Sequence, residues 1–179
     1  MDLTPSVAFN GQFFWNYTAN DQDYWNRYGI CSKVQAFYYF EVPSNKHTKQ
    51  STKSFSDDLR GVWSKNCGSY PAGLVLNLDL PHNVFTSEFN TQLINFNLQI
   101  APFFDMALFY DKNANQKFNF YDNGYYCGGV EFLVYPVKWS SITGRVSLGV
   151  DLKSASHENN FLEAISNNKE IFIGIGLQY

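Results

Sequence analysis

Apolar and polar residues alternate along most of this chain with a period of two, which is the pattern of a β-strand with one apolar face. The clearest case is the last ten residues, EIFIGIGLQY (170–179). Every second position there is large and apolar: Ile171, Ile173, Ile175, Leu177 and Tyr179. The positions between them are mostly small or polar, so the pattern predicts a strand with two unlike faces.

Six further segments alternate in the same way. We predict strands over 6–16, 28–42, 72–80, 94–110, 125–135 and 144–152. Helix signals are weak, and 159–169 is the one stretch that favours a short helix within a loop. The polar faces of the strands carry charged residues: Lys33, Glu41, Asp79, Asp105, Glu131, Arg145 and Asp151. The sequence therefore predicts an all-β, antiparallel protein without an internal domain boundary.

Two kinds of protein fit strands with one apolar and one polar face. A transmembrane β-barrel turns the apolar face to lipid and the polar face to its lumen, whereas a secreted β-sandwich turns the polar face to solvent. Strands of roughly nine residues or more match tilted membrane-spanning strands better than the shorter strands of soluble sheets. These features favour a membrane barrel.

The connections between the strands also alternate in length. The connections 43–72, 110–124 and 153–169 are long, and 81–93 and 136–142 are shorter. Outer-membrane barrels have this asymmetry, with long extracellular loops and short periplasmic turns. The connection 17–27 belongs to the periplasmic set and is longer than the arrangement predicts.

The composition agrees with a membrane barrel and excludes one class of partner. Aromatic residues make up 18% and charged residues 16% of the chain, whereas soluble domains have roughly 25% charged residues. The formal net charge is −3, so no basic field attracts nucleic acid. No segment approaches the ~20 apolar residues of a membrane helix. The N-terminus, MDLTPSVAFNG, lacks a signal-peptide pattern, so a location outside the cytoplasm predicts a mature form or a fragment.

Residues with metal-binding or catalytic chemistry are scattered. Cys31, Cys67 and Cys127 have no paired spacing, which favours unpaired thiols over one disulfide with a leftover thiol. The three histidines lie in predicted loops without ligand partners, so we expect no metal and no cofactor. Carboxylates occur throughout, but no nucleophile–base set stands at an informative spacing, and we do not expect an enzyme.

Three short motifs occur in a fixed order along the chain. DDLRGV (57–62) lies in the longest loop, NLDLP (77–81) ends the next predicted strand, and APFFDMALFYD (101–111) covers the strand after it. This order resembles the C-terminal barrel of the bacterial surface-antigen superfamily. The superfamily includes the outer-membrane protein assembly insertase, its translocation relatives and the transporters of two-partner secretion.

The hallmark of that family is an Arg-Gly motif at the tip of the sixth extracellular loop, after an aliphatic residue and usually before an aromatic one. Leu59, Arg60 and Gly61 match it, and Val62 replaces the aromatic residue. In the family the loop folds back into the barrel, where its arginine pairs with acidic residues on the next two strands.

The resemblance implies that Arg60 pairs with Asp79 and Asp105, both of which the alternation puts on the polar face. The second acid of the family lies in a Phe-x-Asp-x-Gly motif. Phe103 and Asp105 match this motif, and Ala107 replaces its glycine. A buried guanidinium needs such charged, bidentate partners, because an unpaired buried charge is costly.

The end of the chain also resembles a family feature. Gly174, Leu177 and the terminal Tyr179 are similar to the C-terminal β-signal that the outer-membrane assembly machinery reads, although Phe172 stands where a polar residue is usual. The resemblance covers residues from about 6 to the end and implies the last seven strands of a sixteen-stranded barrel. Upstream strands and periplasmic domains would then be missing from 1–179, or the sheet would close by adding a strand or by oligomerising.

The resemblance implies a bacterial outer-membrane protein that inserts or translocates other proteins. Its partners would be outer-membrane lipid, the assembly machinery and a client or cargo protein that the sequence does not specify. Two alternatives remain at this point. The chain could be a small porin-like or adhesin barrel in which the Arg-Gly match is accidental, or a soluble secreted β-sandwich or lipid-binding protein.

Overall fold

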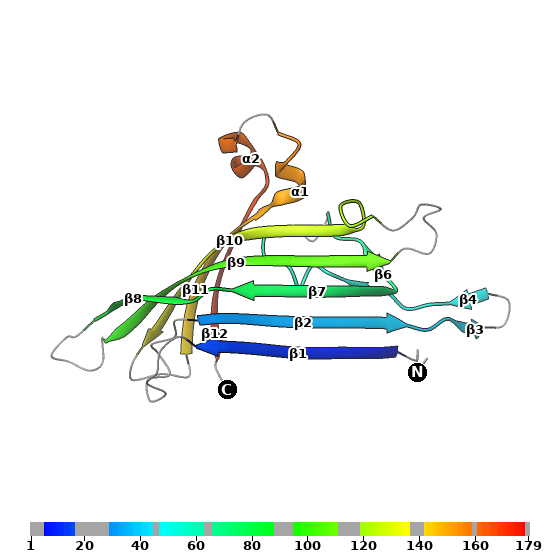
Figure 1. Cartoon of the computed structure of the whole chain (residues 1–179), viewed down its shortest axis with the longest axis horizontal. Helices are drawn as coiled ribbons and strands as arrows, with labels where there is room; N and C mark the ends of the chain where they lie inside the picture. Colours follow the sequence, from blue (N-terminus) through cyan, green and yellow to red (C-terminus); the bar gives the residue numbers. More distant parts are fainter. Residues whose placement is uncertain are drawn as a thin grey trace.

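The computed structural model describes residues 6–16, 29–44, 47–62, 66–87, 95–110, 119–136, 142–158 and 161–177. These residues form a large antiparallel sheet in the order β1-β2-β7-β9-β10-β11-β12, with β8 also paired to β9 (Figure 1). The strands are β1 (Ser6–Asn16), β2 (Gly29–Tyr39), β7 (Ala72–Asp79), β8 (His82–Thr86), β9 (Phe96–Tyr110), β10 (Gly124–Pro136), β11 (Ile142–Asp151) and β12 (Lys169–Leu177). The all-β, antiparallel class is confirmed, and every predicted strand has a counterpart.

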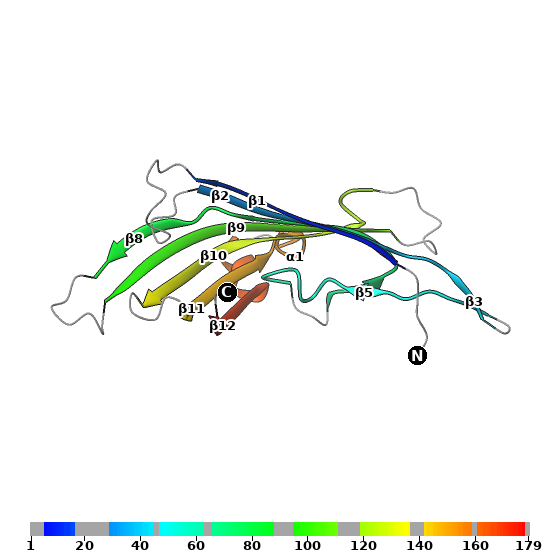
Figure 2. The same cartoon turned by 90° about the horizontal axis from the view of Figure 1, so that it is seen from below.

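The sheet is curved and open. Figure 2 shows it bending from β1 and β2 round to β11 and β12. Within the described part of the chain, β1 and β12 are its two edges and do not pair with each other, so the sheet does not close into a barrel. No helix among the described residues is long and apolar enough to cross a membrane.

One face of this sheet is apolar and uncovered. The side chains predicted for the apolar face are exposed on both edge strands, with Phe9 at 62% and Ile173 at 75% of their full accessibility. The same face is exposed farther into the sheet: Tyr38, Leu74, Phe132, Val146 and Leu148. Among the described residues, the short helical segment after β11 contacts one end of this face, but no second sheet covers it, although a soluble β-sandwich requires one.

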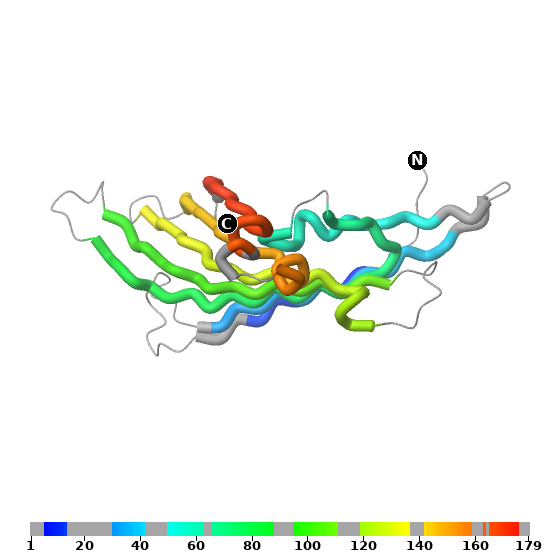
Figure 3. Tube along the Cα trace, turned by 90° about the horizontal axis from the view of Figure 1, so that it is seen from above, coloured from blue at the N-terminus to red at the C-terminus, as the bar shows by residue number. Residues whose placement is uncertain are grey.

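The other face is covered in part by the long connection between β2 and β7. This connection contains the short strands β3 (Val42–Ser44), β4 (His47–Lys49), β5 (Lys53–Ser54) and β6 (Ser69–Tyr70). Figures 2 and 3 show that the part with β5 and β6 lies along the inner side of the curved sheet. We call the described residues 50–62 and 66–71 the inner loop.

The inner loop and the sheet enclose a small hydrophobic core between them. Its buried members are Phe37, Phe55, Leu59, Val62, Val75, Ala107, Phe109 and Cys127. Phe55 has no exposed surface, and its ring lies over Gly73, where a side chain would leave no room for it. The Tyr70 and Phe109 rings stack with their centroids 3.8 Å apart. This aromatic packing holds the loop against the inner face.

Two features of the fold differ from the predicted elements. The residues after Pro81 were predicted as a connection and instead form β8. Between β7 and β8 the chain stays beside β9, because the Leu80 amide donates to the Pro102 carbonyl (2.9 Å). After β11 the chain forms α1 (Leu152–Ala155) and α2 (Phe161–Asn167). The helix predicted within 159–169 corresponds to α2. The alternation predicted that the strand extends to Leu152. In the structure Leu152 begins α1 instead, because the Asp151 carboxylate caps the helix by accepting from the Lys153 and Ser154 amides.

Candidate functional site

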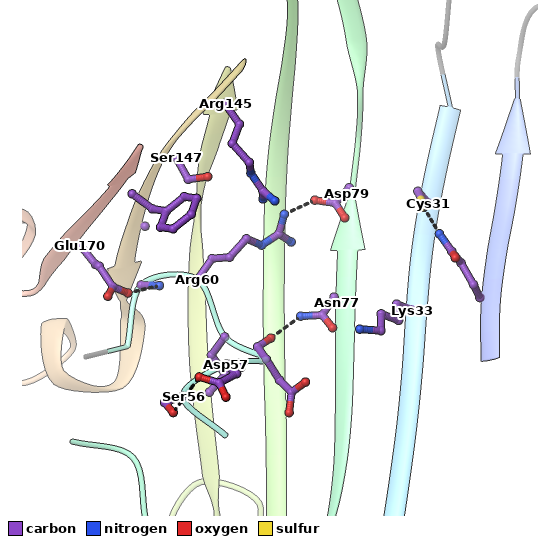
Figure 4. A pocket seen from close by; sticks show the side chains of 16 residues that line it. Cys31, Lys33, Ser56, Asp57, Arg60, Asn77, Asp79, Arg145, Ser147 and Glu170 are labelled. Atoms are coloured by element: carbon purple, nitrogen blue, oxygen red, sulfur yellow. Dashed lines mark hydrogen bonds and ion pairs between the residues drawn. The ribbon is translucent and has the colours of Figure 1, made fainter. Parts of the chain in front are cut away.

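Arg60, at the tip of the inner loop, is bound by two carboxylates of the sheet, Asp79 and Asp105. Figure 4 shows its contact with Asp79. Its Nε donates to Oδ2 of Asp105 (2.9 Å) and its Nη2 to Oδ1 of the same residue (2.6 Å). Its Nη1 donates to Oδ1 of Asp79 (2.5 Å). The Asp105 side chain is fully buried. The structure therefore brings together the arginine and the two acids that the resemblance pairs.

The register of the sheet explains why these groups meet. Asn77 of β7 lies opposite Asp105 of β9, and Asp79 lies opposite Phe103. Residues two apart on a strand share a face, so both acids and the Phe103 ring point to the inner side. The Arg60 guanidinium carbon lies 4.0 Å from the centroid of the Phe103 ring, a cation–π contact. In the Phe-x-Asp motif, Phe103 thus provides an aromatic ring that stacks with the guanidinium of Arg60, and Asp105 provides its bidentate carboxylate partner.

The surroundings keep Arg60 charged. Burial lowers the pKa of the guanidinium, but the hydrogen bond and charge of Asp105, followed by those of Asp79, outweigh it. The pKa of Arg60 is therefore raised above its ordinary value. The arginine fork and the facing carboxylates form the planar, charge-assisted geometry that lysine cannot reproduce.

A third carboxylate, Glu131 of β10, joins the cluster and was absent from the predicted site. Its Oε2 lies 3.7 Å from Nη1 of Arg60. Its Oε1 accepts from the Arg145 guanidinium and from the Ser147 hydroxyl (2.5 Å) of β11. The alternation had put Glu131 and Arg145 on the polar face. Their contact with each other depends on the β10–β11 register, and the approach of Glu131 to Arg60 depends on the position of the inner loop.

The inner loop also contacts β11 and β12 through glycines. Gly61 has φ = 123°, a backbone conformation that residues with a side chain rarely adopt. Its amide donates to Oε2 of Glu170 (3.0 Å). A Cβ on Gly149 would lie 2.7 Å from the Gly61 Cα and 2.8 Å from the Arg60 carbonyl carbon. The glycine of the Arg-Gly motif therefore allows the loop backbone to approach β11 closely.

Gly149→Ala should displace the loop and destabilise the fold. Because the new methyl group meets backbone rather than a flexible side chain, we expect a loss of about 1–3 kcal/mol in the free energy of unfolding. The matched control is Gly144→Ala on the same strand, where the nearest atoms to a Cβ are 3.9 Å away. Denaturant unfolding should separate the two variants, and equal stabilities would contradict the close approach.

The C-terminal residues of the prediction lie on the edge strand β12 or outside the described residues. Gly174 pairs with Arg145, the partner of Glu131, so it adjoins the outer side of the cluster. Leu177 pairs with Ile142 at the end of β12. Tyr179 lies outside the described residues.

Comparison with protein-family models gives no match, and neither the curated proteins nor the solved structures contain a match to this chain. The family resemblance of the Arg-Gly loop therefore remains an interpretation of its residues. The geometry of the loop and the two faces of the sheet carry the functional argument.

A polar pocket of about 580 Å³ lies beside the loop tip, lined among others by Lys33, Asp58, Arg60, Asp79 and Glu170 (Figure 4). The described residues contain no group of three or more His, Cys, Asp or Glu placed to hold a metal ion.

Burial, followed by the charges of Asp151 and Glu170, raises the pKa of the Cys67 thiol to about 11, so this cysteine is protonated at neutral pH. The arrangement of charges serves to fasten a loop.

Proposed function

We propose that this chain forms part of a bacterial outer-membrane β-barrel of the surface-antigen superfamily, which inserts proteins into the outer membrane or translocates them. One observation carries the proposal. The Arg60 guanidinium lies between Asp79 and Asp105 on the covered face, while the opposite, apolar face is exposed. Both faces are explained if the inner loop is bound to the lumen side of a barrel wall through Arg60 and the opposite side of the wall faces lipid.

The exposed apolar face supports a membrane environment. Soluble monomers rarely expose contiguous apolar surface beyond a few hundred Å². Here large apolar side chains follow one face from β1 to β12: Val7, Phe9, Phe13, Tyr38, Leu74, Phe132, Val146, Leu148, Ile171, Ile173 and Ile175. Lipid would cover this face without a second protein layer, as it covers the exterior of outer-membrane barrels.

Strand direction limits how the open sheet closes. Each neighbouring pair along β1-β2-β7-β9-β10-β11-β12 is antiparallel, so β1 and β12 run in the same direction. An all-antiparallel barrel then requires an odd number of further strands between them. The sixteen-stranded barrel of the family leaves nine, whereas a second copy in the same orientation would join β12 to β1 in parallel. The larger barrel is therefore favoured over closure by a dimer.

The alternatives fit the geometry less well. An accidental Arg-Gly match in a porin-like or adhesin barrel predicts an arginine in solvent, but the Arg60 side chain is only 21% exposed and contacts two acids. A secreted β-sandwich or lipid-binding barrel predicts a protein layer over the apolar face, whereas the large apolar side chains named above are exposed there and no second sheet of described residues covers them.

Depletion in the bacterium that encodes the protein tests the proposal. We expect lower amounts of heat-modifiable outer-membrane barrels or of a secreted client, measured by quantitative proteomics of membrane and culture fractions. Re-expression of the wild-type chain in its native gene should restore them, and Arg60→Ala should not. Unchanged assembly and secretion together with altered uptake of small solutes would instead indicate a porin.

A further inference from the structure

The two helices after β11 border an open apolar pocket on the outer face of the sheet. The pocket has a volume of about 430 Å³. Gly128 of β10 and Val150 of β11 form its floor, and the helical segment forms its walls: Leu152, Ala155, Ser156, Glu158 and Ile165. Figure 1 shows α1 and α2 together beside β10, where β11 ends. The pocket is therefore separate from the Arg60 cluster, which lies on the opposite face.

Contacts at the base and side of the helical segment hold the pocket in shape. The Asp151 amide donates to the Asn168 carbonyl (3.0 Å), which closes the segment where it leaves and rejoins the sheet. Lys153 Nζ donates to the Asp122 carbonyl (3.0 Å), and the Tyr121 and Ser156 hydroxyls are hydrogen-bonded (3.0 Å). The segment is thus fastened to the turn that precedes β10.

We propose that this pocket binds one acyl chain of a membrane lipid; the inference rests on the proposed membrane location of the sheet. The pocket continues the exposed apolar face, because Leu148 precedes Val150 by two residues on the same side of β11 and is 39% exposed. Phe132 and Ile171 extend that face on the neighbouring strands, at 41% and 60% exposed. An acyl chain beside these residues can enter the pocket without leaving an apolar surface.

The chemistry of the lining fits an acyl chain better than a polypeptide. A helix is about 10–12 Å wide with its side chains, which is too large for this pocket. An extended peptide or a second copy needs hydrogen-bond partners for its backbone, but the floor strands already pair with each other through Gly128 and Val150. The Ser156 hydroxyl is likewise engaged with the Lys153 carbonyl (2.8 Å). An acyl chain requires no polar partner.

The position of the pocket indicates which part of the membrane supplies the lipid. The helical segment connects β11 to β12 at the same end of the strands as the inner loop and the connection between β9 and β10. The long connections of outer-membrane barrels are extracellular. The lipid would therefore belong to the outer leaflet and would anchor the α1–α2 segment against the barrel wall.

Gly128→Leu tests the pocket by filling it. A Cβ on Gly128 would meet its nearest atoms at 3.5 and 3.6 Å, which is ordinary contact, so the strand should tolerate the larger residue. The matched control is Gly144→Leu, which adds the same side chain to the outer face of β11 away from the pocket. Identical heat-modifiability of all three proteins would establish that each variant folds.

The probe is a phosphatidylcholine vesicle whose lipids carry a photoreactive diazirine at the end of one acyl chain. The complete barrel protein, of which the proposal makes this chain a part, is reconstituted, irradiated and digested, and the labelled residues are mapped by mass spectrometry. We expect labelling of residues 152–165 in the wild type and in Gly144→Leu, and a decrease of about tenfold in Gly128→Leu. The leucine side chain would exclude about two methylene groups of the acyl chain from the pocket, and the tenfold loss of occupancy corresponds to about 1.4 kcal/mol.

The other outcomes separate this inference from the proposed function. Equal labelling of 152–165 in all three proteins, or labelling of 171–175 without any in 152–165, would overturn the pocket and leave the membrane location standing. Absence of label from 171–175 in every protein would contradict the membrane location itself, because Ile171, Ile173 and Ile175 are the most lipid-accessible residues that the proposal names on β12.

Discussion

Arg60→Ala is expected to lower the free energy of unfolding by about 3–5 kcal/mol, because removing one partner of a buried ion pair leaves the other charge uncompensated. Asp105 has no exposed side-chain surface and would lose both charge-assisted hydrogen bonds. Asp79 would lose its bond to Nη1. Like-charge repulsion among these acids and the nearby Glu131 would add to the loss.

Equilibrium unfolding in denaturant, with the protein reconstituted in vesicles and followed by tryptophan fluorescence, measures this effect. Lys53→Ala provides a control from the same loop. Lys53 pairs with Asp58 at 2.7 Å, and their side chains are 35% and 10% exposed. Because this single pair is partly open to solvent, we expect its removal to cost less than removal of Arg60 from the fully buried Asp105. Arg60→Lys should fall between the two, since it keeps the charge and loses the fork. If Arg60→Ala lowered the free energy of unfolding no more than Lys53→Ala, the Arg60 ion pairs would not hold the loop to the sheet.

Phe55→Ala is expected to have an effect of similar size through packing. The side chain has no exposed surface, and its ring lies within 5.6–6.5 Å of four aromatic rings, measured between centroids: Phe37, Tyr70, Phe109 and Tyr125. Removing a buried phenylalanine side chain typically costs about 3–5 kcal/mol, because the cavity collapses only in part. The inner loop should then open more often from the sheet.

Limited proteolysis of residues 50–71 and denaturant unfolding together measure this change. Phe120→Ala is the matched control, since the Phe120 side chain is 65% exposed in the turn before β10. We expect its stability to stay within about 0.5 kcal/mol of the wild type. If the two variants were equally stable and equally resistant to protease, the aromatic core would not hold the loop.

The strands and their two faces could be predicted because alternation is a local property. A strand's side chains change face at every residue, so one apolar series fixes both the element and its orientation. The first strand, over 6–16, has the predicted bounds. The same argument put Asp79 and Asp105 on one face, which left only the position of Arg60 to be supplied by the family resemblance.

The remaining features depend on contacts between distant parts of the chain. The close approach of Gly61 to Gly149 joins residues that no local pattern relates. Glu170 occupies one of the positions between the apolar residues of the last strand, but its bond to the Gly61 amide depends on where the loop lies. The strand β8 was missed because Pro81 interrupts the alternation just before it. Asp151 looked like a strand residue and acts instead as the cap of α1.

Closure of the sheet was also beyond the local pattern. The described strands leave β1 and β12 as edges, and their shared direction follows from counting antiparallel pairs rather than from any motif. Open edges expose unpaired backbone groups that a membrane does not satisfy. The proposal therefore requires further strands, outside the described sheet, that pair with β1 and β12.

The most direct test of the central claim compares neighbouring residues on the two faces of β12. Nitroxide-bearing amino acids would be introduced separately at Phe172 and Ile173, which are 53% and 75% exposed on opposite faces. Relaxation by oxygen and by a water-soluble nickel complex would then be measured in vesicles. We expect the label at 173 to respond mainly to oxygen, as in lipid, and the label at 172 mainly to nickel, as in an aqueous lumen. Nickel-dominated relaxation at both positions would contradict the account.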